Sequence, residues 1–178
     1  LTTDQVVTLD SAQLSYLTTS QVAGMNSDQL SAIDAGEIVG LTTAAIVALS
    51  GAQLGSLTTE QVAGLTTAQL RAIETRDIAS LTTDQLTSID DGDMVALTTS
   101  QVVALSGAQV ASLTEDQLDG LTSVQLRAIE VADIGSLTTD QVVTLDSAQL
   151  SYLTTSQVAG MNSDQLSAID AGEIVGLT

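Results

Sequence analysis

An eight-residue repeat runs through the whole sequence without insertion or deletion. Counted from Leu1, it gives 22 octads and leaves only the last two residues over. Octad position 1 is always Leu, Ile or Met, position 6 is always Val, Leu, Ile or Met, and position 5 is Gln in 16 octads. A fixed period of this kind is typical of solenoids, in which each unit stacks on its neighbours. We therefore expect residues 1–178 to form a single continuous repeat array with no internal domain boundary.

The spacing of positions 1 and 6 excludes one long helix. Eight residues overshoot two helical turns by about 80°, so the aliphatic side chains would wind around such a helix instead of forming a stripe. In a strand the two positions would point to opposite faces, which suits only a sheet covered on both sides. This leaves short helical segments or a β-solenoid.

The start of each octad favours the helical interpretation. Thr18 and Gln21 have the spacing of a capping box, and Leu17 with Val22 takes the positions of a hydrophobic staple. The same box recurs at Thr2/Gln5, Thr58/Gln61, Thr66/Gln69, Thr82/Gln85, Thr98/Gln101, Thr114/Gln117 and Thr122/Gln125. Other residues that cap well stand at position 2 in other octads: Asp10, Asn26, Asp34 and Ser50. The sequence predicts an all-α solenoid of short capped helical segments, one per octad, with the β-solenoid as the alternative.

Glycine is frequent at octad position 8, as at Gly24, Gly40, Gly64 and Gly120. This position follows the expected helix, where glycine commonly ends a helix and lets the chain change direction. We expect these glycines, and the Ala or Ser residues in the same place, to turn the chain into the next cap.

A longer period overlies the octads. Octads that open with Ile and lack Gln at position 5 start at Ile33, Ile73, Ile89, Ile129 and Ile169. They close modules at residues 1–40, 41–80, 81–96, 97–136 and 137–176. Four modules contain five octads and the third contains two. This period is consistent with about five helical segments per superhelical turn, and equally with duplication history alone.

The longest period is 136 residues. Residues 137–178 are identical to residues 1–42, so the sequence begins again after 17 octads. Convergence on a packing rule does not produce an identity of this length. It implies tandem copies of a 136-residue unit, and it predicts a chain that continues beyond both ends of this sequence.

The charge is strongly negative and evenly spread. Lys plus Arg number 3 against 22 Asp plus Glu, which gives a formal net charge of −19. Such a surface keeps a long polymer soluble and opposes binding to nucleic acid or to an anionic membrane. Polar residues interrupt every octad, so no run approaches a membrane span. We expect no nucleic-acid partner and no membrane insertion.

Few residues could support chemistry. The sequence contains no His, Cys or Lys, so the hydroxyl groups have no familiar activating base and there is no thiolate or Schiff-base lysine. We expect no enzymatic activity, no small-molecule substrate and no cofactor. Calcium is the one metal that the composition suggests, because Asp90, Asp91 and Asp93 form the densest acidic stretch. This stretch lacks the EF-hand spacing, and the favoured interpretation makes Asp90 an N-cap and puts Asp93 in place of the capping-box Gln.

Two resemblances accompany these patterns. Residues 97–104, Leu-Thr-Thr-Ser-Gln-Val-Val-Ala, resemble the opening of the repeat in TAL-effector DNA-binding proteins. The longer two-helix unit, the base-reading pair and the basic residues of that family have no counterpart here, so no DNA function is carried over. Arrays of the Leu-Thr-Thr-Asp-Gln-Val type also look like the repetitive regions of giant bacterial surface and secreted adhesin-like proteins. That resemblance covers the whole chain and implies an extracellular or cell-surface stalk or filament.

The sequence therefore predicts a structural protein. We expect an extracellular filament, stalk or spacer made of tandem 136-residue units, with self-association or continuation of the same chain into a fibre. The alternative is an adhesin-type binding solenoid that recognises a glycan, a protein or calcium. Only a few features break the monotony that a spacer would have: Arg71, Arg76, Arg127, Tyr16, Tyr152 and the short module at residues 81–96. These residues either form a binding surface or make contacts between coils or chains.

Overall fold

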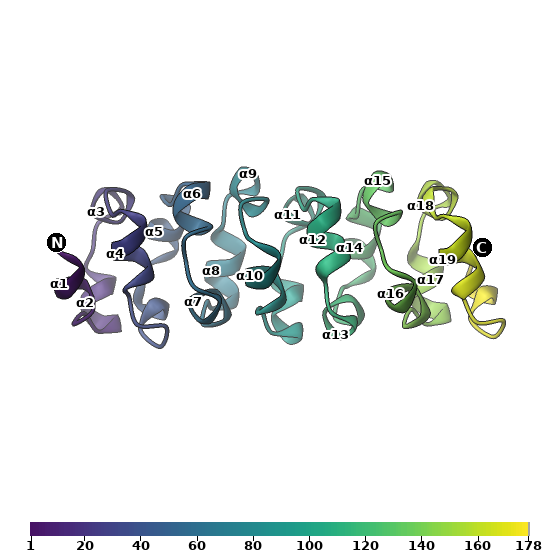
Figure 1. Ribbon diagram of the computed structural model, residues 1–178, viewed down its shortest axis with the longest axis horizontal. Coiled ribbons are helices and arrows are strands. Elements are labelled where there is room, and N and C mark those ends of the chain that lie inside the picture. Colours follow the sequence, from purple (N-terminus) through teal and green to yellow (C-terminus); the bar gives the residue numbers. More distant parts are fainter. Residues whose placement is uncertain (178) are drawn as a thin grey trace.

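A computed structural model describes residues 1–177, which form an elongated rod of short helices with the two ends of the chain at its two ends (Figure 1). The first half contains α1 (Thr3–Val6), α2 (Ser11–Ser15), α3 (Thr19–Ala23), α4 (Ser27–Ser31), η1 (Ile38–Gly40), α5 (Thr43–Val47), α6 (Gly51–Leu54), α7 (Thr59–Ala63), α8 (Thr67–Ala72), α9 (Thr75–Ile78) and α10 (Thr83–Thr87). The second half contains η2 (Asp91–Ala96), α11 (Thr99–Val103), α12 (Gly107–Ser112), α13 (Glu115–Asp119), α14 (Ser123–Ala128), α15 (Val131–Ile134), α16 (Thr139–Val143), α17 (Ser147–Tyr152), α18 (Thr155–Gly160), α19 (Ser163–Ala168) and η3 (Ile174–Gly176).

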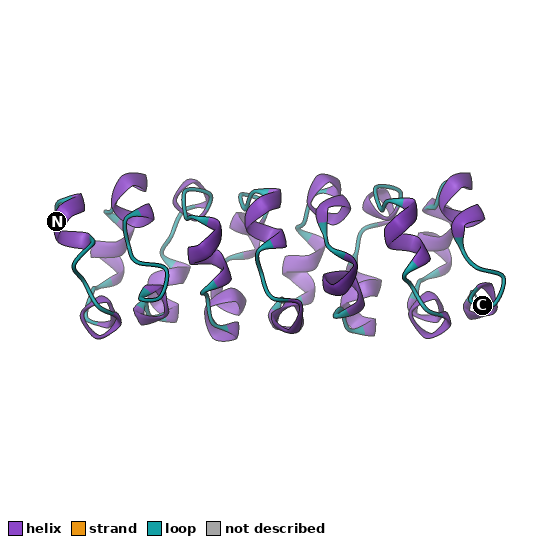
Figure 2. Cartoon of the chain, turned by 60° about the horizontal axis from the view of Figure 1, so that its bottom comes forward, coloured by secondary structure: helices purple, strands orange, loops and turns teal. Residues whose placement is uncertain are grey.

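Each octad contributes one α-helix or one 3-10 helix, and Figure 2 shows only helices and loops. No strand occurs within residues 1–177, so the predicted all-α solenoid is confirmed and the β-solenoid is excluded. The C-terminal Thr178, the last residue of the repeated stretch 137–178, lies outside the described residues.

The capping boxes form as predicted. In α3, the hydroxyl of Thr18 accepts from the N–H of Gln21 at 3.2 Å, and the side-chain oxygen of Gln21 accepts from the N–H of Thr18 at 2.7 Å. All 16 octads with Gln at position 5 contain this pair of bonds. The box matters because helices of four to six residues cannot satisfy their own terminal amides.

The octads that open with Ile depart from this rule. Asp34 does not cap an α-helix; its side chain accepts from the N–H of Gly36 at 2.8 Å, and the octad continues as the 3-10 helix η1. Glu74 and Glu130 stand at the N-caps of α9 and α15 without a side-chain capping bond. The expectation that Asp34 caps its segment as Thr does is therefore wrong, since the side-chain bond closes a local turn two residues on.

Helices stack on the helices three octads before them. Close contacts join α2 to η1, α5 to α8, α11 to α14 and α16 to α19, and the other strongly contacting pairs have the same separation. One coil of the solenoid therefore contains about three octads. The interpretation of the five-octad module as one superhelical turn is wrong; duplication history, the other explanation of that period, is unaffected.

Positions 1 and 6 form one apolar cluster along the axis of the rod. The ends show which neighbour buries each position. In the first coil, Leu1 is 62% exposed whereas Val6 is buried, and in the last coil Ile174 is 47% exposed whereas Ile169 is buried. Position 1 is thus covered by the preceding coil and position 6 by the following one. The side chains at positions 1 and 6 are therefore both buried only where a coil has a neighbour on each side.

The glycines at position 8 do not act through their backbone freedom. Within residues 1–177 no glycine has a positive φ, and Gly64 lies in the right-handed helical region with φ −81°. A Cβ at Gly64 would instead lie 2.8 Å from the carbonyl oxygen of Ala35, and one at Gly40 would overlap the backbone of Ser11. Gly24, Gly64 and Gly120 are the C-caps of α3, α7 and α13, so they stand where the chain turns towards the next cap, as expected, but without a left-handed conformation. At Gly40, Gly64 and Gly120 there is no room for a side chain, because the backbone three octads earlier passes against these residues.

Candidate functional site

The side chain of Gln at position 5 bonds to two coils at once. In α10, Gln85 accepts from the N–H of Thr82 at 2.8 Å through its oxygen, which completes the capping box. Its nitrogen donates to the carbonyl oxygens of Leu54 at 3.2 Å and Leu57 at 2.6 Å, which belong to the preceding coil. Gln85 is only 2% exposed. A buried amide of this kind needs partners for both its oxygen and its nitrogen, and here it has them.

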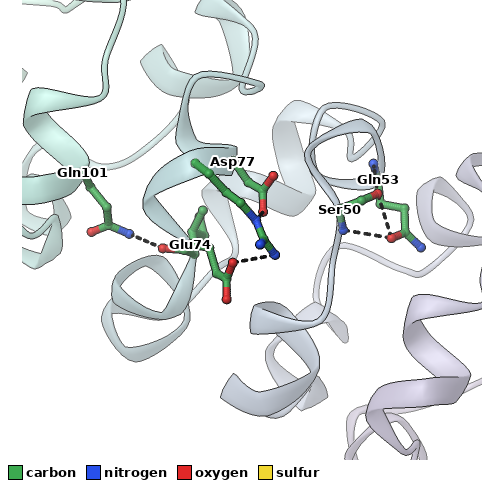
Figure 3. Close-up of polar contacts among 7 residues, drawn as sticks. Ser50, Gln53, Glu74, Asp77 and Gln101 are labelled. Atoms are coloured by element: carbon green, nitrogen blue, oxygen red, sulfur yellow. Dashed lines mark hydrogen bonds and ion pairs between the residues drawn. The ribbon is translucent and has the colours of Figure 1, made fainter.

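The same bonds recur from coil to coil. The amide nitrogen at position 5 donates to carbonyl oxygens 28 and 31 residues earlier, which are position 1 of one octad and position 6 of the octad before it. We call this row the glutamine ladder. Its members with both bonds are Gln53, Gln61, Gln69, Gln85, Gln101, Gln109, Gln117, Gln125, Gln141, Gln157 and Gln165. Figure 3 shows the Gln101 amide pointing across to a carbonyl of the neighbouring coil.

Sequence reasoning found only the capping half of this role. A Glu side chain can complete a capping box as well as Gln can. Yet no octad that opens with Leu or Met has Glu at position 5. That exclusive choice of amide over carboxylate is the signal that the nitrogen is used, because only the amide can donate a hydrogen bond at neutral pH.

Where position 5 is Glu, the side chain accepts a hydrogen bond from the preceding coil instead of donating one to it. The carboxylate of Glu37 accepts from the N–H of Ser11, at the start of α2, at 2.5 Å. Glu173 and Ser147 make the equivalent bond. A carboxylate at this place satisfies a free amide at a helix N-terminus in the coil before it. Asp77 lies in the corresponding place beside the start of α6. A Cβ added at Gly51, the first residue of that helix, would lie 3.0 Å from Oδ1 of Asp77.

The three arginines serve contacts between or within coils. Arg71 Nε donates to the carbonyl oxygen of Ala96 at 3.3 Å, and Arg127 Nε donates to that of Tyr152 at 2.9 Å; each pair is 25 residues apart. Arg76 pairs instead with Glu74 at 2.6 Å and Asp77 at 3.3 Å in its own octad (Figure 3). Contacts between coils thus explain Arg71 and Arg127 without a ligand.

The calcium candidates are placed as follows. Asp90 is the N-cap of η2, and its side chain accepts from the N–H of Gly92 at 3.0 Å. Asp91 is exposed and Asp93 is half-buried. Asp93 does not complete a capping box. In the part of the chain that the structure describes, no three acidic side chains come together as a metal site would require.

The outer surface carries the charges. Glu60 at the second position of α7 is typical of these exposed acids. Its own backbone N–H, followed by the hydroxyls of Thr58 and Thr59, lowers the pKa of the Glu60 carboxyl below its ordinary value. Among residues 1–177 there is no helix with the length and apolar character needed to span a bilayer.

These features define an all-α solenoid of capped octads whose coils are joined by a glutamine ladder. The chain belongs to the ALTTAQ repeat family, whose sequence model matches residues 30–67, 86–123 and 123–163. No curated protein matches the chain. Neither finding links the chain to adhesins or to TAL effectors.

Proposed function

We propose that the chain is a structural element: an extracellular filament, stalk or spacer built from tandem 136-residue units. The observation that carries this proposal is the glutamine ladder together with the apolar rows at positions 1 and 6. Both run from coil to coil through the described residues. Nearly every residue type that the octad keeps constant is used to hold the next coil. We therefore infer that the repeated octads serve to make a long rod, because each coil is held to the next one in the same way.

The charge distribution supports the same proposal. Twenty-two acidic residues against three basic ones are spread over the array. Dispersed negative charge resists lateral clumping of long parallel rods. An extracellular or cell-surface location rests on the resemblance to the repetitive regions of surface proteins, and immunolabelling of intact cells tests it. Labelling only after the cells are broken open would contradict that location.

Electron microscopy of the native material tests the structural role. We expect uniform fibres whose axial repeat is set by the 136-residue unit. Discrete particles that bind cells or glycans with saturable affinity would overturn the proposal in favour of the adhesin-type solenoid. We propose no enzymatic activity, no nucleic-acid partner and no small-molecule substrate for the chain.

A further inference from the structure

The contacts that hold the coils together are nearly the same for every octad. The glutamine ladder uses backbone carbonyl oxygens at positions 1 and 6 as acceptors, and every octad has them. The apolar rows contain only Leu, Ile, Val and Met, which replace one another in a packed stack at small cost. Neither contact distinguishes one octad from the next. A coil shifted by one octad would therefore form almost the same ladder and the same apolar rows.

Two octads differ from all others at position 3. That position is glycine only at Gly51 and Gly107, which are the first residues of α6 and α12. The helices stacked on α6 and α12 are α9 and α15, which belong to the octads 73–80 and 129–136. These are the only octads in the sequence that combine Asp at position 5 with Ser at position 8. Each unusual octad is thus stacked on the other unusual kind.

Gly51 is needed because the following coil fills the space that its side chain would take. A Cβ at Gly51 would lie 3.0 Å from Oδ1 of Asp77 and still closer to Oγ of Ser80. Threonine is the commonest residue at position 3. Its branched side chain would add two further atoms to this occupied space. The octad that carries Asp77 and Ser80 therefore stacks without a clash only on an octad with glycine at position 3.

The second pair of octads has the same geometry. A Cβ at Gly107 would lie 3.0 Å from Oδ1 of Asp133 and 2.6 Å from Oγ of Ser136. The octads 73–80 and 129–136 differ from each other at positions 3, 4 and 7, yet both have the Asp and the Ser. The arrangement is thus kept where the residues around it have changed.

The Asp at position 5 is essential to this selection, because Ser at position 8 does not by itself exclude threonine. In the octad 81–88, Gln85 and Ser88 lie above Thr59, and Oγ of Ser88 donates to the carbonyl oxygen of Thr59 at 2.9 Å. The amide nitrogen of Gln85 bonds to the coil below. The shorter Asp77 has no such nitrogen, and its carboxylate lies beside the start of α6 instead.

We propose that these residues form two register locks, which make the coils stack in a single alignment. One lock consists of Gly51, Asp77 and Ser80, and the other consists of Gly107, Asp133 and Ser136. A slip by one octad would place Asp77 and Ser80 over Thr43 or Thr59. At the second lock, the corresponding residues would be Thr99 or Glu115. The locks give specificity by excluding the wrong partner, since the attractive contacts are alike in every alignment.

A repeat chain needs such a device while it folds. Stacking can begin at any place in an array of similar units and spread from there. Stretches that began in different alignments would meet out of step. Each lock lies within one of the two modules 41–80 and 97–136, so each of these modules fixes its own alignment. This role concerns how the chain stacks and is independent of the proposed filament.

A double-mutant cycle tests the steric part of the first lock. Gly51→Thr is expected to lower the equilibrium constant of folding at least about tenfold in urea unfolding, as overpacking does. Asp77→Gln with Ser80→Ala gives the upper octad the residues that the octad 97–104, stacked over Thr75, has at positions 5 and 8. In that background Gly51→Thr is expected to change the constant less than about threefold. Equal losses in the two backgrounds would overturn the proposal.

The alignment itself is measured in a variant without locks. It combines Gly51→Thr, Asp77→Gln and Ser80→Ala with Gly107→Thr, Asp133→Gln and Ser136→Ala. Spin labels are attached to cysteines introduced at Ala52 in α6 and Ala79 directly after α9, both of which are exposed. After refolding, pulsed electron paramagnetic resonance is expected to show one short distance in the labelled parent. The variant without locks is expected to keep its helical circular dichroism and to show additional, longer distances.

The matched control is Ser27→Thr with Ser56→Ala. These residues take positions 3 and 8 of two stacked octads that have Gln53 at position 5 and no lock. The control is expected to show the single distance of the parent. A single distance in the variant without locks as well would show that other contacts set the alignment, and it would overturn the proposal. That outcome would leave the filament role standing, which electron microscopy of native fibres tests separately.

Discussion

Gln61 Nε2 lies 2.7 Å from the carbonyl oxygen of Ile33 and joins two coils that are 28 residues apart in sequence. The oxygen of the same side chain accepts from the N–H of Thr58 at 2.9 Å, at the start of its own helix. One amide therefore begins a helix and holds that helix to the coil before it. Local helix formation and stacking depend on the same side chain, but on different atoms of it, and substitutions can separate the two.

Gln85→Glu separates them inside the rod. The introduced carboxylate keeps the capping bond but turns an oxygen toward the carbonyls of Leu54 and Leu57. We expect the free energy of unfolding at pH 7 to fall by roughly 3–5 kcal/mol, as for a buried charge without a partner. Urea unfolding measures this loss. Gln5→Glu is the control, because Gln5 is exposed and has the same capping box, and it should have little effect.

The loss caused by Gln85→Glu should depend on pH. Burial without a cation raises the folded-state pKa of the introduced carboxyl above its unfolded value of about 4.3. The penalty is therefore present in full above the folded pKa. It disappears as the pH falls below the unfolded value, where the neutral group can donate a hydrogen bond. A loss that is the same at pH 7 and pH 4, relative to the parent at each pH, would show that the position tolerates charge.

Gly64→Ala tests the close approach of coils. Its Cβ would lie 2.8 Å from the carbonyl oxygen of Ala35, and the coil must shift to admit it. We expect a destabilisation of about 1–3 kcal/mol, in the range of overpacking. Gly24→Ala is matched in local sequence, but its Cβ would meet only the carbonyls of its own helix, the nearer at 3.2 Å. It should change the thermal stability much less. Equal losses would assign the glycine to helix ending instead.

Leu70→Asp tests the apolar row at position 6. Leu70 is 1% exposed in α8, and the substitution buries a charge with no partner. We expect a loss of roughly 3–5 kcal/mol in chemical denaturation. Ser20→Ala, at an exposed position of α3, should be nearly silent. If both substitutions were equally disruptive, the assignment of the inner face would be wrong.

The carboxyl of Glu60 should titrate below its ordinary range in a carbon-detected NMR experiment, since its backbone N–H and two threonine hydroxyls favour the charged form. A depressed pKa contributes stability above the unfolded pKa, and that contribution is lost as the pH falls through the folded value. Thr58→Ala removes one of the hydroxyls and should move the titration upward. An unchanged midpoint would show that the hydroxyl does not contribute.

Folding is expected to be independent of calcium. The caps, the apolar rows and the glutamine ladder are made entirely by protein atoms, and Asp90 is engaged as an N-cap. Addition of a chelator should leave the helical circular dichroism unchanged. Loss of ellipticity on chelation, restored by calcium, would assign Asp90, Asp91 and Asp93 to a metal site.

The sequence by itself determined the local structure. The capping box joins residues three positions apart, as in Thr18 and Gln21, and the apolar positions 1 and 6 lie within one octad. Interactions this local depend on residue type and spacing, so the all-helical solenoid and its inner face could be predicted. The five octads that open with Ile were harder, because an acidic residue at position 2 serves an α-helical cap and an isolated turn equally well.

Only the tertiary structure decided what joins the coils. The second role of Gln85, the bond from Ser11 to Glu37 and the need for Gly64 depend on residues 26 to 31 positions apart. Which residues meet at that range is set by how many octads complete one coil, and the octad period is compatible with several values. The number of octads per coil depends on the angle between consecutive helices at each corner. The packing of whole coils on one another selects that angle. With three octads per coil, the amide nitrogen of the glutamine lies next to two carbonyl oxygens of the preceding coil, and the glycine packs against the backbone of that coil. Neither contact can be predicted from the sequence of a single octad.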